Sequence, residues 1–156
     1  MYKIKTIKQR QTGSSMIEIL VAVFILAVGL LGLASLQMVS LKNINNTQFQ
    51  TLATTYAYDM AERMRSNREG LSGYDNILST VADPNCTTCT PAQMAQLDGF
   101  EWNSLIQSTV MNGGLPEGKG TVTKNGSVYD IEIKWKELQT RDLGNDDGEI
   151  TLKVQI

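Results

Sequence analysis

The feature that most constrains this chain is an apolar run near its amino terminus. From Ile19 to Leu41 there are 23 residues without a charge, and Met16–Leu36 is almost wholly apolar. As a helix, Met16–Leu36 would measure roughly 31 Å, about the thickness of the hydrocarbon core of a bilayer. Residues 1–17 contain four basic residues, Lys3, Lys5, Lys8 and Arg10, and no acidic one. The sequence therefore predicts one membrane-spanning helix with a cytoplasmic amino terminus and an external domain after Leu41.

Two other interpretations of the apolar run stay open. A conventional secretory signal would be cleaved near Gly32-Leu33-Ala34, but its apolar core is usually about 7–15 residues long. A simple membrane anchor does not explain Glu18, the only acidic residue before Asp59. A carboxylate in hydrocarbon costs on the order of 3 kcal/mol, of which the dipole of the helix recovers about 0.3–1 kcal/mol. We therefore expect Glu18 to pair with a positive group of another chain, such as a newly exposed terminal amine.

Composition excludes several classes of function. The chain has no histidine, so serine–histidine or cysteine–histidine catalysis and histidine-ligated zinc sites are ruled out. A net charge of −2 gives no case for direct binding of nucleic acid. No pair of carboxylates stands out from the ordinary polar faces of helices and strands. We therefore predict no catalytic residue, no cofactor and no metal, and a protein that is not an enzyme.

The segment Gly13-Ser14-Ser15-Met16-Ile17-Glu18, followed by the apolar helix, resembles the leader of type IV prepilins and pseudopilins. This resemblance implies that a prepilin peptidase cuts between Gly13 and Ser14 and then methylates the amino group of Ser14. Glu18 becomes the fifth residue of the mature chain and serves subunit assembly. The family usually has phenylalanine where this chain has Ser14. Cleavage would leave 10 basic and 16 acidic residues.

Beyond the membrane segment the pattern predicts an α+β domain. The amphipathic stripe of Met38, Leu41, Phe49, Leu52, Tyr56, Met60 and Met64 predicts that the first helix continues to about Arg68. A second helix is expected to begin at Thr90 as N-cap with Pro91 in its first turn and to end near Asn112-Gly113-Gly114. Its buried side would hold Ala95, Trp102, Leu105 and Ile106.

The carboxyl-terminal part predicts antiparallel strands. Apolar and polar residues alternate strictly in 129–136 and 149–156, which is typical of strands with one face on a core. Asn125-Gly126 predicts a hairpin turn that joins Thr121–Lys124 to the next strand. The expected architecture is pilin-like: a long helix packed on a three-stranded antiparallel sheet. Its segments are a leader at 1–13, a transmembrane half-helix at 14–41 and an external domain at 42–156.

Other segments resemble minor pilins of the PilV family, the type IV pilus modification proteins. They are found, in the order of that family, at 61–68, 98–102, 115–118 and 129–135. This resemblance implies a structural subunit that primes pilus assembly and sits at the filament tip, supporting twitching motility and adhesion. Its partners would be the prepilin peptidase, other minor pilins, the major pilin, a tip adhesin and, before assembly, the inner membrane. The alternative is a pseudopilin of a type II secretion system.

Three smaller features have simple structural interpretations. Cys86 and Cys89 are expected to form a disulfide in an exported domain, since a zinc site would need further ligands. The acidic segment 144–149 is expected to be a turn between strands rather than a calcium site, because it lacks the spacing of an EF-hand loop. Trp102 and Trp135 are expected in the core. The charges from Glu62 to Glu69 are interpreted as a solvated helix end.

Overall fold

The computed structural model describes residues 15–137 and 147–156 and divides the chain into two compact units, with the boundary between Ser40 and Leu41. Helix α1 (Met16–Ser66) begins in the first unit and ends in the second. Its early turns form easily, because Leu, Met and Ala favour helices and no proline interrupts the run. The second unit is the globular one, and we describe it by itself.

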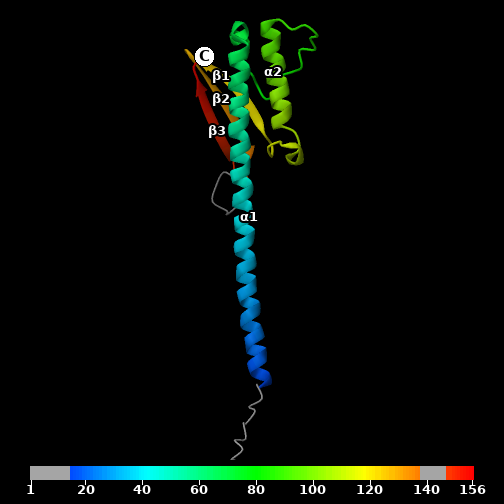
Figure 1. The fold of residues 1–156 in the computed structure, drawn as a ribbon, viewed down its shortest axis with the longest axis vertical. Coiled ribbons are helices and arrows are strands. Elements are labelled where there is room, and N and C mark those ends of the chain that lie inside the picture. The colour runs from blue at the N-terminus through cyan, green and yellow to red at the C-terminus, as the bar shows by residue number, and fades with distance from the viewer. Residues whose placement is uncertain (1–14, 138–146) are drawn as a thin grey trace, which may run out of the picture. The chain divides into compact units, whose positions relative to one another are not determined.

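The globular unit combines helices with one small sheet (Figure 1). After α1 the chain forms the 3-10 helix η1 (Arg68–Tyr74), then α2 (Pro91–Ile106) and the short 3-10 helix η2 (Val110–Asn112). The strands β1 (Lys119–Asn125), β2 (Val128–Lys136) and β3 (Asp147–Val154) follow. They pair in the order β1-β2-β3, each antiparallel to its neighbour. The predicted α+β architecture, a long helix packed on an antiparallel sheet, is confirmed.

The alternating strands place their apolar residues on the core as predicted. Along β2, Tyr129, Ile131, Ile133 and Trp135 are all buried. Asn125 pairs with Val128, so the two loop residues are Gly126 and Ser127, one position later than the sequence indicated. Gly126 has a φ of 65°, a left-handed conformation that glycine adopts at no steric cost.

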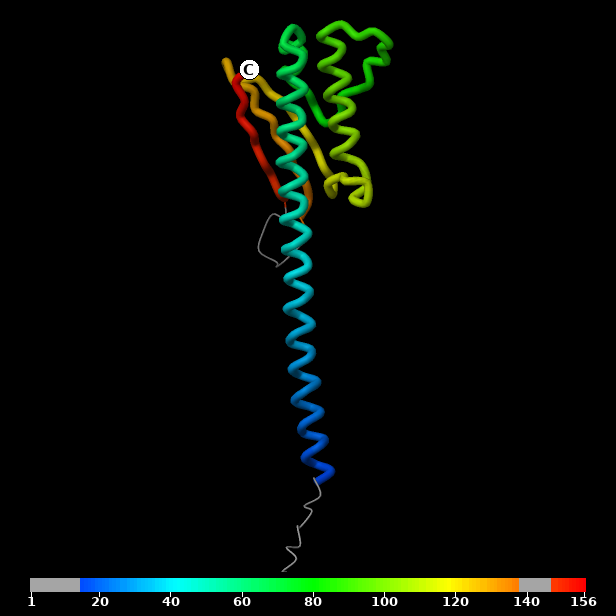
Figure 2. Tube along the Cα trace, viewed as in Figure 1, coloured from blue at the N-terminus to red at the C-terminus, as the bar shows by residue number. Residues whose placement is uncertain are grey.

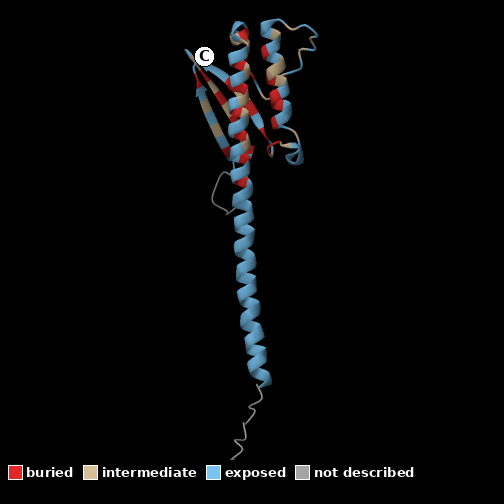
Figure 3. Ribbon diagram, viewed as in Figure 1, coloured by how far each residue is buried: buried red, intermediate tan, exposed pale blue. Residues whose placement is uncertain are grey.

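The core lies between one side of α1, α2 and the sheet (Figure 3). The buried residues of α1 begin at Asn46 and recur along one side as Phe49, Ala53, Ala57, Met60, Ala61 and Met64. The predicted stripe is therefore right from Phe49 onward. It is wrong at Met38 and Leu41, which are exposed, because the globular unit packs on the helix only beyond these turns.

Helix α2 begins as predicted and ends earlier than predicted. Thr90 is the N-cap, Pro91 occupies the first turn, and Thr90 and Gln93 form a reciprocal capping box. The helix stops at Ile106, whose carbonyl accepts a hydrogen bond from the Leu115 N–H at 2.8 Å. This tertiary bond closes the connection to β1 and leaves η2 as a separate turn. Leu105 is 43% exposed, so its predicted place in the core is wrong.

Candidate functional site

The first unit presents an apolar helical surface. Every large apolar side chain from Met16 to Leu41 is between 46% and 88% exposed. An 18-residue window in this part of α1 has a mean hydropathy of 2.8, and no part of it is buried. By length and composition this helix can cross a membrane. So large an apolar surface requires lipid or protein to cover it.

Glu18 lies in the first turn of α1, within this apolar surface. The helix starts directly after Ser15, whose carbonyl accepts hydrogen bonds from the N–H groups of Glu18 at 2.9 Å and Ile19 at 3.3 Å. A carboxylate in the first turn interacts favourably with the positive end of the helix dipole. Gly13 and Ser14, the predicted cleavage and methylation positions, lie outside the described residues.

In the globular unit, Arg63 joins α1 to α2. Its guanidinium contacts three carboxylates: Asp59 at 3.0 Å, Asp98 at 3.1 Å and Glu101 at 3.0 Å. Burial alone would lower the pKa of Arg63, but hydrogen bonds to these carboxylates outweigh burial and raise it. The sequence-based interpretation of this segment as a solvated helix end is therefore wrong for Arg63. Its two partners on α2 lie 35 and 38 positions further along the chain, which no local pattern reveals.

Tyr74 extends the Arg63 network to η1. It is fully buried, and its hydroxyl donates to Asp98. Asn67 donates one hydrogen bond to the Tyr74 oxygen at 3.3 Å and another to the Pro91 carbonyl at 2.8 Å. Burial, followed by the hydrogen bond to Asp98, raises the pKa of Tyr74 well above its ordinary value. The network holds the end of α1 against the start of α2. In Figure 2 the chain leaves the end of α1 and returns beside it to begin α2.

The raised pKa of Tyr74 predicts that the globular unit loses stability at alkaline pH. A tyrosine that resists ionisation in the folded state contributes stability below its unfolded pKa of about 10 and loses that contribution as the pH rises above it. At neutral pH we expect Tyr74→Phe to lower the free energy of unfolding by about 2 kcal/mol, through the lost bond to a carboxylate. This difference from the wild type should shrink above about pH 10.

The measurement is chemical unfolding of the full chain in mild detergent, followed by tryptophan fluorescence from pH 7 to 11. Tyr58→Phe is the matched control, because Tyr58 is 56% exposed and stands outside the network. A difference between wild type and Tyr74→Phe that stayed constant with pH would contradict the assignment.

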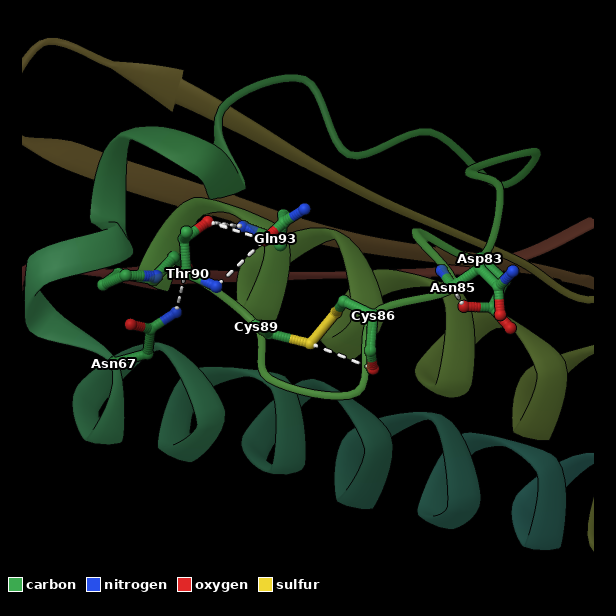
Figure 4. Close-up of a disulfide and its surroundings, with 8 residues drawn as sticks. Asn67, Asp83, Asn85, Cys86, Cys89, Thr90 and Gln93 are labelled. Carbon is green, nitrogen blue, oxygen red and sulfur yellow. Dashed lines mark hydrogen bonds between the residues drawn. A yellow bond between two sulfur atoms is a disulfide. The ribbon is translucent and has the colours of Figure 1, made fainter.

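The predicted disulfide is present, between Cys86 and Cys89 (Figure 4). Both residues are half-buried. The bridge lies directly before the capping box, in which the Thr90 N–H donates to Gln93 Oε1 at 3.0 Å and the Gln93 N–H donates to Thr90 Oγ1 at 3.3 Å. The disulfide therefore fixes the loop that delivers the first turn of α2.

Removal of this bridge is expected to weaken the fold moderately. The double variant Cys86→Ser, Cys89→Ser should lose about 2 kcal/mol of unfolding free energy, since a loop this short restricts the unfolded chain only a little. Wild-type protein treated with a reducing agent should match the variant in urea unfolding. Equal stability of oxidised wild type and variant would show that the capping box holds the loop alone.

The acidic segment 144–149 is placed only in part. Asp147, Gly148 and Glu149 belong to β3, while Gly144, Asn145 and Asp146 lie outside the described residues. Within 15–137 and 147–156 no group of three metal-ligating side chains comes together. A depression of about 550 Å³ between the end of α2 and the start of β1 has Glu117 and Lys119 as its titratable lining residues. Glu117 is paired with Lys136 at 3.4 Å, so this depression offers no acid–base pair of its own.

Two family models match the chain. Residues 35–100 match the Tt1218-like family, described as type IV pilin Tt1218. Residues 8–34 match the prokaryotic N-terminal methylation motif. No curated protein and no solved structure gives a significant match. Pilins are structural proteins rather than enzymes. The two matches, the apolar helix and the fold together support a membrane-anchored structural subunit of the type IV pilin kind.

Proposed function

We propose that this chain is a minor pilin of the PilV kind. It would prime the assembly of a type IV pilus and remain at the filament tip with other minor pilins and a tip adhesin, so supporting twitching motility and adhesion. The observation that carries the proposal is the methylation-motif match over residues 8–34, which contains Gly13, Ser14 and Glu18. It coincides with the start of a helix whose first large apolar side chains are all exposed.

The proposed route begins in the inner membrane. The basic leader stays in the cytoplasm, α1 crosses the bilayer, and the globular unit lies outside. A prepilin peptidase cuts between Gly13 and Ser14 and methylates the new amino group. The freed Ser14 amine of one subunit then becomes available to the Glu18 carboxylate of a neighbour, and the apolar helices leave the lipid for the filament.

The test is the intact mass of the protein, recovered from the membranes and the sheared surface fraction of its native host. We expect a chain that begins at Ser14, with or without one methyl group, present in both fractions. A chain that begins near Ser35 would indicate a conventional secretory signal, and one that retains Met1 a simple anchor. Either result would contradict the proposal.

Location separates a pilus from a secretion system. A pseudopilin of a type II secretion system would show the same processing but would be missing from surface filaments. Deletion of the gene should reduce the number of pili, and complementation with the intact gene should restore that number. Normal piliation with a specific defect in secretion would favour the pseudopilin.

A further inference from the structure

The two edges of the sheet differ in how their backbone groups are bonded. In the order β1-β2-β3, strands β1 and β3 each pair with β2 on one side only (Figure 1). On the outer side of β1, the N–H groups of three alternate residues are bonded by other parts of the chain. Gly120 donates to Asn103 Oδ1 at 3.0 Å, Val122 to the Ile77 carbonyl at 2.9 Å and Lys124 to Asp75 Oδ1 at 3.1 Å. The edge at β1 is therefore closed.

The register shows which backbone groups lie on the outer edge of β3. Because the three N–H groups of β1 just given point away from β2, the residues between them, such as Thr121, bond to β2. Thr121 pairs with Glu132, and the preceding residue of β2, Ile131, pairs with Leu152. Bonding sides alternate along a strand, so Glu132 bonds to β1 while Ile131 and Leu152 bond to each other. The residues of β3 whose N–H and C=O groups point outward are therefore Glu149, Thr151 and Lys153.

The outer edge of β3 is open. Within residues 15–137 and 147–156, no hydrogen bond of the chain reaches the outward N–H and C=O groups of these three residues. Over Asp147–Val154 there is no proline, and the pairing with β2 has no bulge. Covering segments, bulges, proline and lysine are usual protections of an edge strand. Of these, β3 has only Lys153, so its edge can accept a further strand.

A groove lies beside this edge, on the core side of the sheet. It has a volume of about 160 Å³ and is lined by two elements, α1 with Thr54, Ala57 and Tyr58 and β3 with Ile150, Thr151 and Leu152. Ile150 and Leu152 pack against the core but are only half-buried. Facing side chains of neighbouring strands share one side of a sheet. An added strand would therefore place every second side chain beside Ile150 and Leu152, where apolar groups gain by burial.

The solvent side of β3 carries charges in a fixed order. Along it lie the acidic Glu149, the neutral Thr151 and the basic Lys153. Glu149 contacts Lys134 of β2 at 3.8 Å and Lys153 contacts Asp130 at 3.4 Å, yet their side chains stay 50% and 71% exposed. Opposite charges that face each other on neighbouring strands stabilise a sheet. A complementary strand therefore has a basic residue opposite Glu149 and an acidic residue opposite Lys153.

We propose that the outer edge of β3 binds an extended segment of a partner polypeptide, which joins the sheet as an antiparallel fourth strand. Alternate residues of that segment are apolar and face the groove. Between them, a basic, a neutral and an acidic residue face Glu149, Thr151 and Lys153. Backbone bonds to the open edge supply affinity, and the groove and the charges supply selectivity. This inference goes beyond the proposed function, since it requires only the folded globular unit.

A second copy of this chain is not the proposed occupant, although β3 is complementary to itself in charge. Two antiparallel copies of β3 centred on Thr151 would place Glu149 of each opposite Lys153 of the other. The two-fold axis of such a pair stands normal to the sheet, so it reverses the direction of the partner's α1. Two subunits anchored by that helix in one membrane cannot be related in this way. The sequence of β3 nevertheless has the required pattern, which makes it a suitable probe.

The first test uses a synthetic peptide with the sequence of residues 148–155. We expect it to bind the full chain in mild detergent, as measured by fluorescence anisotropy. In residue-resolved hydrogen exchange without peptide, the amides of Glu149, Thr151 and Lys153 should exchange fast. A peptide concentration about ten times the dissociation constant should slow them roughly tenfold. The amide of Val122, on the closed edge, should exchange slowly with and without peptide.

Substitutions at the edge locate the binding site. Thr151→Pro removes the central outward N–H and spares the bonds to β2, so proline is tolerated there. We expect it to weaken peptide binding at least roughly tenfold. Thr151→Val is the matched control, because valine keeps the N–H group and the branched side chain, and it should bind like the wild type. Urea unfolding of each variant checks that the globular unit is intact.

A charge exchange tests the register without a change in the backbone. Lys153→Glu places an acidic residue opposite the glutamate of the peptide, and we expect binding to weaken. A second peptide, with lysine in place of that glutamate, should bind Lys153→Glu more tightly than it binds the wild type. Equal affinities of the second peptide for the two proteins would contradict the proposed register.

Three further outcomes would overturn the proposal. The first is a folded wild type that does not bind the peptide. The second is equal binding by Thr151→Pro and Thr151→Val, because the peptide would then bind elsewhere. The third is a wild type that dimerises in detergent while Thr151→Pro does not, which would assign the edge to a second copy. None of these results bears on processing at Gly13, so the proposed function stands or falls separately.

Discussion

Replacement of Gly120 by alanine is expected to lower the unfolding free energy of the globular unit by about 3 kcal/mol, the upper end of what overpacking a core usually costs. An alanine Cβ at this position would lie 2.3 Å from Cζ3 and 2.5 Å from Cη2 of Trp102, and 2.8 Å from Cδ1 of Ile106. Real Cβ atoms essentially never approach other atoms so closely, so either the ring or the strand must move.

Neither the Trp102 ring nor strand β1 can move without breaking a hydrogen bond. The Trp102 ring is completely buried, and its Nε1–H donates to the Tyr56 carbonyl of α1 at 2.8 Å. On the other side, the Gly120 N–H donates to Oδ1 of the buried Asn103 at 3.0 Å. A shift of the ring breaks the first bond, and a shift of β1 breaks the second. Each would leave a buried polar group without its partner, which costs about 1–3 kcal/mol.

The matched control is Gly126→Ala in the β1–β2 turn. Gly126 has no atom within 4 Å of a Cβ built there, but its φ is 65°. Alanine in this left-handed conformation costs about 1 kcal/mol without any clash. Urea unfolding of the full chain in detergent, followed by tryptophan fluorescence, should therefore place Gly120→Ala about 2 kcal/mol below Gly126→Ala. Equal stabilities would mean that the core around Trp102 yields more easily than its contacts indicate.

Features with a repeating pattern could be predicted from the sequence. A strand shows its buried face at every second residue, so the alternation in β2 determined both the strand and its orientation. The start of α2 could be predicted because a helix cap is formed by residues that are neighbours in the sequence, here Thr90 and Pro91. Trp102 and Trp135 were placed correctly in the core for the simplest reason, the large apolar area of the indole.

Features that depend on distant residues could not be predicted. The end of α2 is set by the bond between Ile106 and Leu115, and the apolar spacing around Leu105 gives no sign of it. Arg63 stands in a charged segment that looks solvated until α2 brings two carboxylates to it. The tight fit of Gly120 against Trp102 could not be predicted either, because a glycine in a strand usually indicates weak packing rather than a close contact.

The second large effect concerns Glu18. We expect Glu18→Ala to leave membrane insertion and the globular unit intact and to reduce recovery in sheared filaments by at least tenfold. Insertion should be preserved because the substitution makes the helix more apolar, and an ionised carboxylate in hydrocarbon costs on the order of 3 kcal/mol. In the proposed assembly, that same cost would become a source of specificity. A subunit whose Glu18 meets the Ser14 amine of its neighbour recovers the interaction energy in an apolar surrounding, where such a pair is strong.

Glu18→Gln separates charge from shape, because glutamine keeps the length and hydrogen-bonding oxygen of the side chain without the negative charge. If an ion pair drives assembly, Glu18→Gln should fail nearly as completely as Glu18→Ala. If a hydrogen bond suffices, it should assemble close to the wild-type level. Glu62→Ala is the matched control, since Glu62 is an exposed acid of the same helix, in the globular unit. Normal incorporation of Glu18→Ala would contradict the proposed pairing of Glu18 with the Ser14 amine. Apolar packing of the helices alone would then have to direct assembly.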